Sequence, residues 1–302
     1  MKRIFVALLV LSVLLWTSHV LSAQLDEKKL LSVVHERLNL GKKIPALKLE
    51  HLSVQKKIHI DLTGLSLWAV RINVKLESPT NETRTVMLDL ITDENAQWQF
   101  ENVSDLKNGY PLLEKAWAEL TRVDLNTNIG QVIFRGEGNK NVIVVTDNFC
   151  PFCRTFYQTL PRVYRERVKE VVSIYLPLGN HPGAELACAV SSYVHSKKSL
   201  EQYTREVDDF IFNELQPPEA KDVNEANAAI YEAFKSRFSW FVEEFSGLTI
   251  EKVFEKLRTG SNISEQMRYG KSLNRRGTPI IFVDGKRIDG LDWNKFERFL
   301  SY

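Results

Sequence analysis

The spacing of apolar residues changes from helical to alternating within the first hundred positions of the chain. Residues 26–39 carry apolar side chains at helical spacing, which predicts an amphipathic helix. Four later segments alternate apolar and polar residues with a period of two, which predicts strands with one solvated face: 58–62, 70–77, 86–90 and 97–101. We therefore expect residues 24–106 to form an α+β domain, in which a helix precedes an antiparallel meander.

A connecting segment follows this domain. Residues 107–129 are predicted as a linker helix, with Leu112, Trp117 and Leu120 as its apolar anchors. Beyond it, short and nearly continuous apolar runs replace the alternating pattern. This change indicates that a second domain begins at about residue 130.

The second domain, residues 130–302, alternates strands and helices. Val142–Thr146 is almost entirely apolar and β-branched, as expected for a strand that is buried on both faces. Asp284 and Gly285 lie between two apolar runs and predict the turn of a hairpin. In chain order, the predicted elements are strands 131–135 and 142–146, a helix from Cys150 to about residue 169 with a kink at Pro161, strand 171–178, a helical insertion over about 181–275, a hairpin of 279–283 and 286–288, and a helix over 291–301.

The first 23 residues have the pattern of a secretory signal. Lys2 and Arg3 precede a mostly apolar run over 4–16, and Leu21-Ser22-Ala23 ends in a small residue. The run is shorter than the roughly 20 apolar residues that a membrane span needs. We expect export with cleavage after Ala23, and an uncleaved signal that anchors the protein is the alternative.

The charge balance bears on the class of partner. The 40 Lys and Arg residues face 38 Asp and Glu residues. Removal of residues 1–23 takes away Lys2 and Arg3 and no acidic residue, which leaves 38 basic against 38 acidic residues. A formally neutral chain argues against a nucleic acid as partner, because phosphate binding requires a basic excess.

The candidate chemistry centres on Cys150-Pro151-Phe152-Cys153, which closely follows a predicted strand. Two cysteines three positions apart at the start of a helix are typical of thioredoxin-type redox sites. The helix N-terminus favours a thiolate on Cys150, and Cys153 lies one turn later, where it can close a disulfide onto Cys150. Pro151 suits the first helical turn. Pro151 and Phe152 are candidate tuning residues but carry no charge, so thiolate stabilisation is expected to come mainly from backbone donors.

Half of a zinc site is the other interpretation of such a cysteine pair. Structural zinc needs about four ligands. Neither Cys188 nor the six histidines form a second pair at zinc-like spacing. We therefore expect no metal, and no cofactor apart from a redox-active Cys150–Cys153 disulfide, which the oxidising surroundings of an exported protein permit.

A second chemical element is Gly277-Thr278-Pro279, which precedes the apolar run 280–283. The cis form is uncommon for X–Pro bonds in general, at about 5–6% in folded proteins. In thioredoxin-like folds, however, a cis-proline at this place in the chain order packs beside the CxxC pair. We therefore expect Thr278 and Pro279 to bind the backbone of an extended substrate.

Together these motifs resemble the periplasmic Dsb thiol–disulfide family. The resemblance is carried by residues 144–153 and by Gly277-Thr278-Pro279; Asp147 before Cys150, and Thr278 before the proline, are as in the DsbC/DsbG branch. It implies a periplasmic protein with an α+β N-terminal domain of cystatin-like fold, followed by an α/β thioredoxin-like domain with a helical insertion.

The DsbC/DsbG branch forms V-shaped homodimers through the N-terminal domain, with two active sites facing a shared cleft. The resemblance thus implies a homodimeric protein disulfide isomerase or reductase that acts on misfolded or oxidised client proteins and is itself reduced by a membrane thiol reductant of the DsbD type. The insertion is longer than expected for this branch, which leaves a DsbA-like thiol oxidase as the alternative. An alternative of another class is a chaperone or peptide-binding protein in which the thiols matter little.

Three residues near the motif have open roles. Asp147 is expected to cap the CxxC helix or to assist proton transfer to or from Cys153. His181, in the loop after the predicted third strand, is either a surface residue or a group that tunes the Cys150 thiolate. Cys188 lies in a helical apolar stretch and is expected to be a buried, inert thiol, with a reactive or intermolecular thiol as the alternative.

Overall fold

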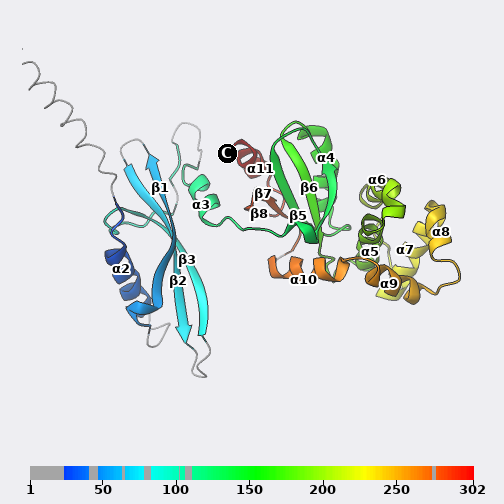
Figure 1. The fold of residues 1–302 in the computed structure, drawn as a ribbon, viewed down its shortest axis with the longest axis horizontal. Helices are drawn as coiled ribbons and strands as arrows, with labels where there is room; N and C mark the ends of the chain where they lie inside the picture. Colours follow the sequence, from blue (N-terminus) through cyan, green and yellow to red (C-terminus); the bar gives the residue numbers. More distant parts are fainter. Residues whose placement is uncertain are drawn as a thin grey trace, which may run out of the picture. The chain divides into compact units, whose positions relative to one another are not determined.

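The computed structural model describes residues 24–40, 47–62, 65–77, 83–101, 103–105, 111–273 and 277–302. The chain divides into two compact units, one that ends at Thr121 and one that comprises Arg122–Tyr302 (Figure 1). The predicted signal, residues 1–23, lies outside the described residues. Within the described part of the chain, no helix is long and apolar enough to cross a membrane.

An antiparallel three-stranded sheet forms the centre of the first unit. Its strands are β1 (Leu52–Leu62), β2 (Leu65–Glu77) and β3 (Thr83–Asp93), in the order β1-β2-β3. Helix α2 (Glu27–Leu40) and the short 3-10 helix Leu49–His51 precede the sheet. The predicted amphipathic helix and the first three predicted strands are therefore confirmed.

Strand β2 is buried on both faces, because a helix covers each side of the sheet. On one face, Val70 and Ile72 belong to a core with residues of α2. On the other face, Leu67 and Ala69 pack with residues of α3 (Glu114–Leu120). The alternating pattern predicted one solvated face for this strand, whereas both of its faces are buried in the structure.

Helix α3 covers most of the connecting helix predicted over 111–121, and within the described part of the predicted linker 107–129 it does not extend beyond Leu120. Helix α3 ends where both the backbone N–H and the hydroxyl of Thr121 donate to the carbonyl oxygen of Trp117. A threonine hydroxyl that bonds back to the preceding turn competes with continuation of the helix. Beyond it, the chain has no regular structure until the 3-10 turn Thr127–Ile129.

The fourth predicted strand, 97–101, was wrong. Two backbone N–H groups, those of Gln97 and Trp98, donate to the carboxylate of Asp93 at 2.8 Å each, which holds a turn directly after β3. Ala96 adopts a positive φ of 53° within this turn. The chain returns to β3 only in an isolated bridge between Thr92 and Gln99. The alternation around Trp98 therefore reflects a short return segment rather than a strand.

A five-stranded sheet forms the centre of the second unit, in the order β4-β6-β5-β7-β8. Its strands are β4 (Gln131–Arg135), β5 (Lys140–Thr146), β6 (Val168–Tyr175), β7 (Ile280–Val283) and β8 (Lys286–Asp289). Strands β5 and β6 are parallel, and the other neighbours are antiparallel. The central position of β5 explains its continuous apolar run, and the predicted hairpin turns at Asp284 and Gly285, both with positive φ.

Helix α4 (Pro151–Val163) ends earlier than the predicted residue 169. Past its end, the N–H groups of Arg167 and Val168 both donate to the carbonyl of Tyr164, and β6 begins at once. Pro161 lies in the last turn, where its missing N–H removes one helical hydrogen bond. Helix α11 (Trp293–Ser301) packs against α4, since the ring of Phe156 contacts those of Trp293 and Phe296 at centroid distances of 5.7 Å.

The predicted helical insertion lies between β6 and β7. It consists of α5 (Ala184–Ser196), α6 (Thr204–Asp209), α7 (Val223–Arg237), α8 (Ser239–Glu244), α9 (Ile250–Thr259) and α10 (Ile263–Leu273), with a 3-10 segment at Lys198–Tyr203 and a π-helical turn at Phe210–Glu214. Elements from α5 to α9 share one apolar core that is rich in phenylalanine. Helix α10 instead covers the sheet, where Tyr269 and Leu273 pack against residues of β5 and β6.

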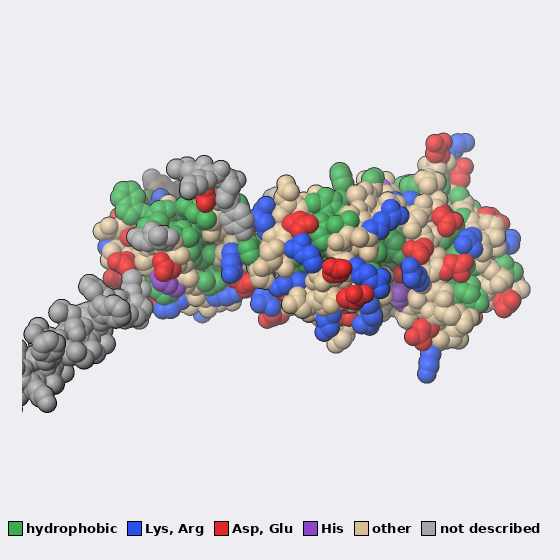
Figure 2. Space-filling model, turned by 90° about the horizontal axis from the view of Figure 1, so that it is seen from above, with side chains coloured by type: hydrophobic (Ala, Val, Ile, Leu, Met, Phe, Trp, Pro, Cys, Tyr) green, Lys and Arg blue, Asp and Glu red, His purple; other side chains and the backbone are tan. Residues whose placement is uncertain are grey.

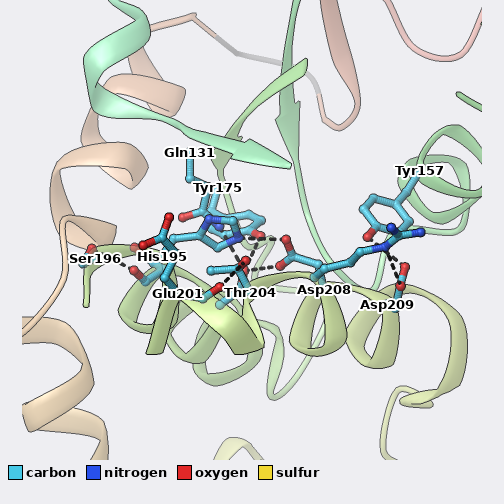
Figure 3. A network of polar contacts seen from close by, with 12 residues as sticks. Gln131, Tyr157, Tyr175, His195, Ser196, Glu201, Thr204, Asp208 and Asp209 are labelled. Atoms are coloured by element: carbon cyan, nitrogen blue, oxygen red, sulfur yellow. Dashed lines mark hydrogen bonds and ion pairs between the residues drawn. The ribbon is translucent and has the colours of Figure 1, made fainter. Parts of the chain in front are cut away.

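A buried polar network joins this insertion to the sheet (Figure 3). Asp208 accepts hydrogen bonds from Ser191 Oγ (2.6 Å) and His195 Nε2 (2.8 Å). Ser191 in turn accepts from the Tyr175 hydroxyl of β6 and from the Gln131 amide of β4. Loss of any one partner would leave a buried polar group unpaired, so the network fixes how α5 and α6 dock on the sheet.

Close packing of α10 gives a first test of this architecture. A Cβ added to Gly270 would meet Leu176 Cβ at 3.2 Å and Val145 Cγ1 at 3.4 Å. We expect Gly270→Leu to lower the free energy of unfolding in urea by about 1–3 kcal/mol, because overpacking forces the helix or the sheet to shift. Gly179→Leu is the control, since a Cβ there would meet nothing within 4 Å. Equal unfolding midpoints for the two variants would contradict the close approach.

Candidate active site

The two cysteines of the motif lie where strand β5 leads into helix α4. Cys150 immediately precedes the helix, with φ −67° and ψ 122°, and Pro151 occupies the first turn. The Cys150 N–H donates to the Asp147 carbonyl (3.1 Å), which closes a tight turn after β5. The Cys150 carbonyl accepts from the Arg154 N–H (3.1 Å), which begins the helix. The structure therefore places Cys150 at the N-terminus of α4.

The segment before β7 brings Thr278 and Pro279 beside this motif. Strand β7 pairs with β5, so the two segments meet although 128 positions separate Cys150 from Thr278. The Thr278–Pro279 peptide bond is cis. The Cys150 Sγ lies 3.2 Å from the Thr278 carbonyl oxygen, to which the protonated form of the thiol donates. Of the two candidate substrate-binding residues, Thr278 thus contacts the candidate nucleophile directly, and Pro279 follows it in the chain.

The two thiols differ in accessibility. Cys150 is 5% exposed and Cys153 is 1% exposed. The side chain of Phe152, between them, is exposed and offers an apolar surface next to Cys150. Cys150 is therefore the thiol that an incoming disulfide reaches first, although it is more enclosed than the sequence suggests.

Asp147 and His181 come together directly behind the motif. The Asp147 carboxylate is fully buried and accepts the N–H groups of Phe149 (2.7 Å) and Leu178 (2.6 Å). Its Oδ2 also lies 2.9 Å from His181 Nδ1. Asp147 thus caps the turn before α4 rather than the first N–H groups of the helix, and His181 is a partner of this turn rather than a free surface residue.

Arg154 is a residue of the site that the sequence analysis missed. Its Nε donates to the Asn148 carbonyl (2.8 Å), and its Nη2 donates to the Ile211 and Leu215 carbonyls at the π-helical turn. The guanidinium also lies over the Phe149 ring, 5.5 Å from its centroid. The available signal was a lone arginine directly after Cys153, but two of its three acceptors are backbone oxygens some 60 positions away, which no side-chain motif reveals.

Residues 127–301, more than half of the chain, match the sequence model of the family described as Thioredoxin. The chain belongs to the thioredoxin family. No curated protein matches the sequence.

Solved structures similar to this thioredoxin-family chain have low sequence identity to it. The crystal structure of oxidised BdbD from Bacillus subtilis is 15% identical, with a TM-score of 0.42, and the match covers 60% of this chain and 96% of that one. The thiol-disulfide exchange protein α-DsbA2 from Wolbachia pipientis is 11% identical, with a TM-score of 0.41 and coverages of 62% and 92%. Proteus mirabilis ScsC, in a transitional conformation, is 16% identical, with a TM-score of 0.38 and coverages of 63% and 77%.

Within this thioredoxin domain, the Cys150 thiolate is strongly stabilised. The pKa of Cys150 is lowered to about 5, chiefly because the Cys153 thiol donates a hydrogen bond to its sulfur. The Thr278 side chain and the backbone N–H groups of Cys153 and Phe152 lower this pKa further, and burial opposes them. The expected backbone donors therefore contribute, but the second cysteine is the largest source of stabilisation.

The other two thiols remain protonated at neutral pH. Burial raises the pKa of Cys153 well above its usual range, and the adjacent Cys150 raises it further. Cys188 is fully buried, and burial together with the Asp147 carboxylate raises its pKa as well. All three cysteines are free in the structure, so this is the geometry of the reduced site. Among the described residues, no group of three or more His, Cys, Asp or Glu side chains is arranged to hold a metal ion.

A pH titration of the reduced protein tests the thiolate. We expect thiolate absorbance at 240 nm to rise with a midpoint near pH 5 in the wild type, and to lack this transition in Cys150→Ser. The folded pKa lies below that of an unfolded thiol, about 8.5. The contribution of this thiolate to the free energy of unfolding is therefore complete above about pH 8.5 and is lost as the pH falls through about 5. A midpoint above pH 8 would refute a preformed thiolate.

Proposed function

We propose that this protein is an exported thiol:disulfide interchange enzyme of the isomerase or reductase type, acting on misfolded or oxidised proteins. The observation that carries the proposal is the Cys150 sulfur at the N-terminus of α4, between the Cys153 thiol and the Thr278 carbonyl. A stabilised thiolate is both a nucleophile at neutral pH and a good leaving group. Disulfide exchange requires both properties of the same sulfur.

The proposed reaction needs only thiols and disulfides. The Cys150 thiolate attacks one sulfur of a substrate disulfide, forms a mixed disulfide and releases the other substrate sulfur as a thiolate, which takes up a proton. Cys153 then loses its proton, attacks Cys150 and releases the substrate, which leaves a Cys150–Cys153 disulfide. In isomerisation, a substrate thiol attacks instead and frees Cys150. Thr278 and Pro279 would hold the substrate backbone during these steps.

The partners follow from the resemblance to the DsbC/DsbG branch. We propose disulfide-containing client proteins in the periplasm as substrates and a membrane thiol reductant of the DsbD type as the source of electrons. Basic and acidic side chains lie interspersed on the face of the larger unit shown in Figure 2. Together with the neutral charge balance of residues 24–302, this favours protein clients over a nucleic acid.

Strand β3 supports a homodimer through the first unit, proposed to be cystatin-like. Within the described residues, the outer edge of β3 pairs only at its end, through the Thr92–Gln99 bridge and the hydrogen bond from Phe100 to Ile91. The rest of this strand carries the exposed apolar residues Val86 and Met87, next to the exposed polar residues Thr83, Arg84 and Thr85. A long and largely unpaired edge strand invites pairing with another strand. A second copy would extend the sheet to six strands around a two-fold axis.

A DsbA-like thiol oxidase is the second candidate function. It is suggested by the large insertion of α5 to α10 between β6 and β7. An oxidase would act as a monomer with a strongly oxidising potential, whereas the proposed isomerase is dimeric.

Cysteine variants test the chemistry of the site. Cys150→Ser is expected to abolish recovery of a scrambled-disulfide substrate, because the attacking sulfur is lost. Cys153→Ser is expected to accumulate a mixed disulfide with the substrate, visible by mass spectrometry without reductant. Undiminished refolding by the Cys150→Ser variant would refute the proposed function and favour a chaperone.

A charge on the β3 edge tests the dimer. Met87 is 59% exposed, so Met87→Lys is expected to leave the fold intact but to convert a dimer into a monomer by light scattering, because a charged side chain on an edge strand opposes its pairing with another strand. Isomerase activity should fall with it. Leu40→Lys, at an exposed apolar residue of α2, is the matched control and should remain dimeric. A wild-type monomer at micromolar concentration would contradict the proposed dimer.

A further inference from the structure

The Arg154 side chain joins two stretches of backbone that lie about 60 positions apart in the chain. Its Nε donates to the Asn148 carbonyl oxygen at 2.8 Å, in the turn that leads into Cys150, which we call the active-site turn. Its Nη2 donates to the carbonyl oxygens of Ile211, at 3.1 Å, and of Leu215, both at the π-helical turn of the insertion. One guanidinium therefore bridges the active-site turn and the insertion.

The bridge depends on the shape of the guanidinium group. Its nitrogen atoms form a planar, rigid fork, so Nε and Nη2 of Arg154 can serve different acceptors at the same time. The Phe149 ring lies against this plane, 5.5 Å from the guanidinium carbon to the ring centroid. A lysine would keep the positive charge but would offer a single nitrogen in place of the two. The positive charge and the bridge can therefore be separated by substitution.

Two other side chains of α4 hold the same π-helical turn. The Tyr157 hydroxyl donates to Asp209 Oδ1 at 3.1 Å, and its ring stacks on that of Phe212 at a centroid distance of 4.3 Å. The Gln158 amide donates to the Phe212 carbonyl oxygen at 3.3 Å. These hydrogen bonds reach the insertion alone, whereas those of Arg154 reach the insertion and the active-site turn. Attachment of the insertion and support of the active-site turn are thus carried by different residues.

The active-site turn sets where the Cys150 sulfur lies against the start of α4. The Cys150 N–H donates to the Asp147 carbonyl at 3.1 Å, and Asn148 lies between these two residues in the chain. A shift of the Asn148 carbonyl would therefore carry Cys150 with it, away from the first turn of α4. The N–H groups at a helix N-terminus stabilise a thiolate but give little to an uncharged disulfide.

We propose that Arg154 is a positioning residue that holds the active-site turn against the insertion, so that the insertion helps to set the oxidising strength of the Cys150–Cys153 disulfide. The inference rests on the proposed exchange chemistry and names what regulates it. Asp147, its contact His181 and the buried Cys188 are further ionisable groups near this turn, and the test below leaves all three unchanged.

Equilibrium with glutathione measures the oxidising strength directly. Two glutathione thiols reduce the Cys150–Cys153 disulfide to two protein thiols and become one glutathione disulfide, so atoms and electrons balance without another reactant. The fraction of oxidised full-length protein is read by mass spectrometry after the free thiols are alkylated. If the wild type does not exchange with glutathione, the proposed function fails, whatever the role of Arg154.

Two variants of Arg154 separate the bridge from the charge. Arg154→Gln is expected to move the equilibrium about tenfold toward the protein disulfide, because loss of one charge-assisted hydrogen bond is worth about one pKa unit of the thiolate. The midpoint of its thiolate absorbance at 240 nm is expected to rise with it. Arg154→Lys keeps the charge without the bridge and is expected to behave like Arg154→Gln. It also serves as the second disrupted variant if Arg154→Gln fails to fold.

Tyr157→Phe and Gln158→Ala are the matched controls. Each removes one hydrogen bond from α4 to the region of the π-helical turn and leaves the bond to Asn148 in place. Both are expected to lower the unfolding midpoint in urea and to leave the glutathione equilibrium and the 240 nm midpoint unchanged. The proposal is overturned if Arg154→Gln leaves both readouts unchanged, if the controls shift them equally, or if Arg154→Lys retains the wild-type values.

Discussion

The proximity of Cys153 to Cys150 within one helical turn is the constraint on which the candidate site depends, because Cys153 is the largest cause of the lowered pKa of Cys150. It makes the two cysteines unequal: the outer sulfur carries the negative charge, and the inner sulfur keeps the proton. Burial of Cys153 enforces this order, because a second thiolate in the same low-dielectric space would be both desolvated and repelled. The polypeptide around the pair serves to keep this asymmetry, with Thr278 on one side and the turn at Asp147 on the other.

The asymmetry requires a rigid support, and the sheet supplies it. Strand β5 lies between β6 and β7 and is buried on both faces, so the point where it ends is fixed from every side. The same pairing with β7 carries Thr278 to Cys150. The insertion adds a second layer of support, since Arg154 reaches the π-helical turn and the Asp208 network locks α5 and α6 to β4 and β6. Hydrogen bonds thus join the insertion to the sheet of the thioredoxin domain, and both support the motif.

The sequence predicted those features that depend on local pattern. Three of the four period-two segments, the continuous apolar run of β5 and the Asp284-Gly285 turn reappear, because side-chain periodicity and turn chemistry are local. The fourth strand was wrong because the Asp93 carboxylate captures the N–H groups that a strand would need. Arg154 was missed, and the partner of His181 was not foreseen, because their contacts join segments that only the folded chain brings together. Local sequence patterns thus predict helices, strands and turns, whereas the residues that hold a site in place are set by contacts between segments far apart in the chain.

A stabilised thiolate does not by itself distinguish an isomerase from an oxidase. Lowering the pKa of Cys150 to about 5 stabilises the reduced form at neutral pH and makes the disulfide form the better oxidant. An oxidase uses that tendency by passing its disulfide on, whereas an isomerase uses it to keep Cys150 free for attack on a wrong disulfide. The two activities must therefore differ in which substrates reach Cys150 and in which reductant acts on the Cys150–Cys153 disulfide. We propose that the first unit makes this difference, since most of the outer edge of β3 has no partner strand among the described residues and a dimer formed there would restrict access to a pair of reduced sites.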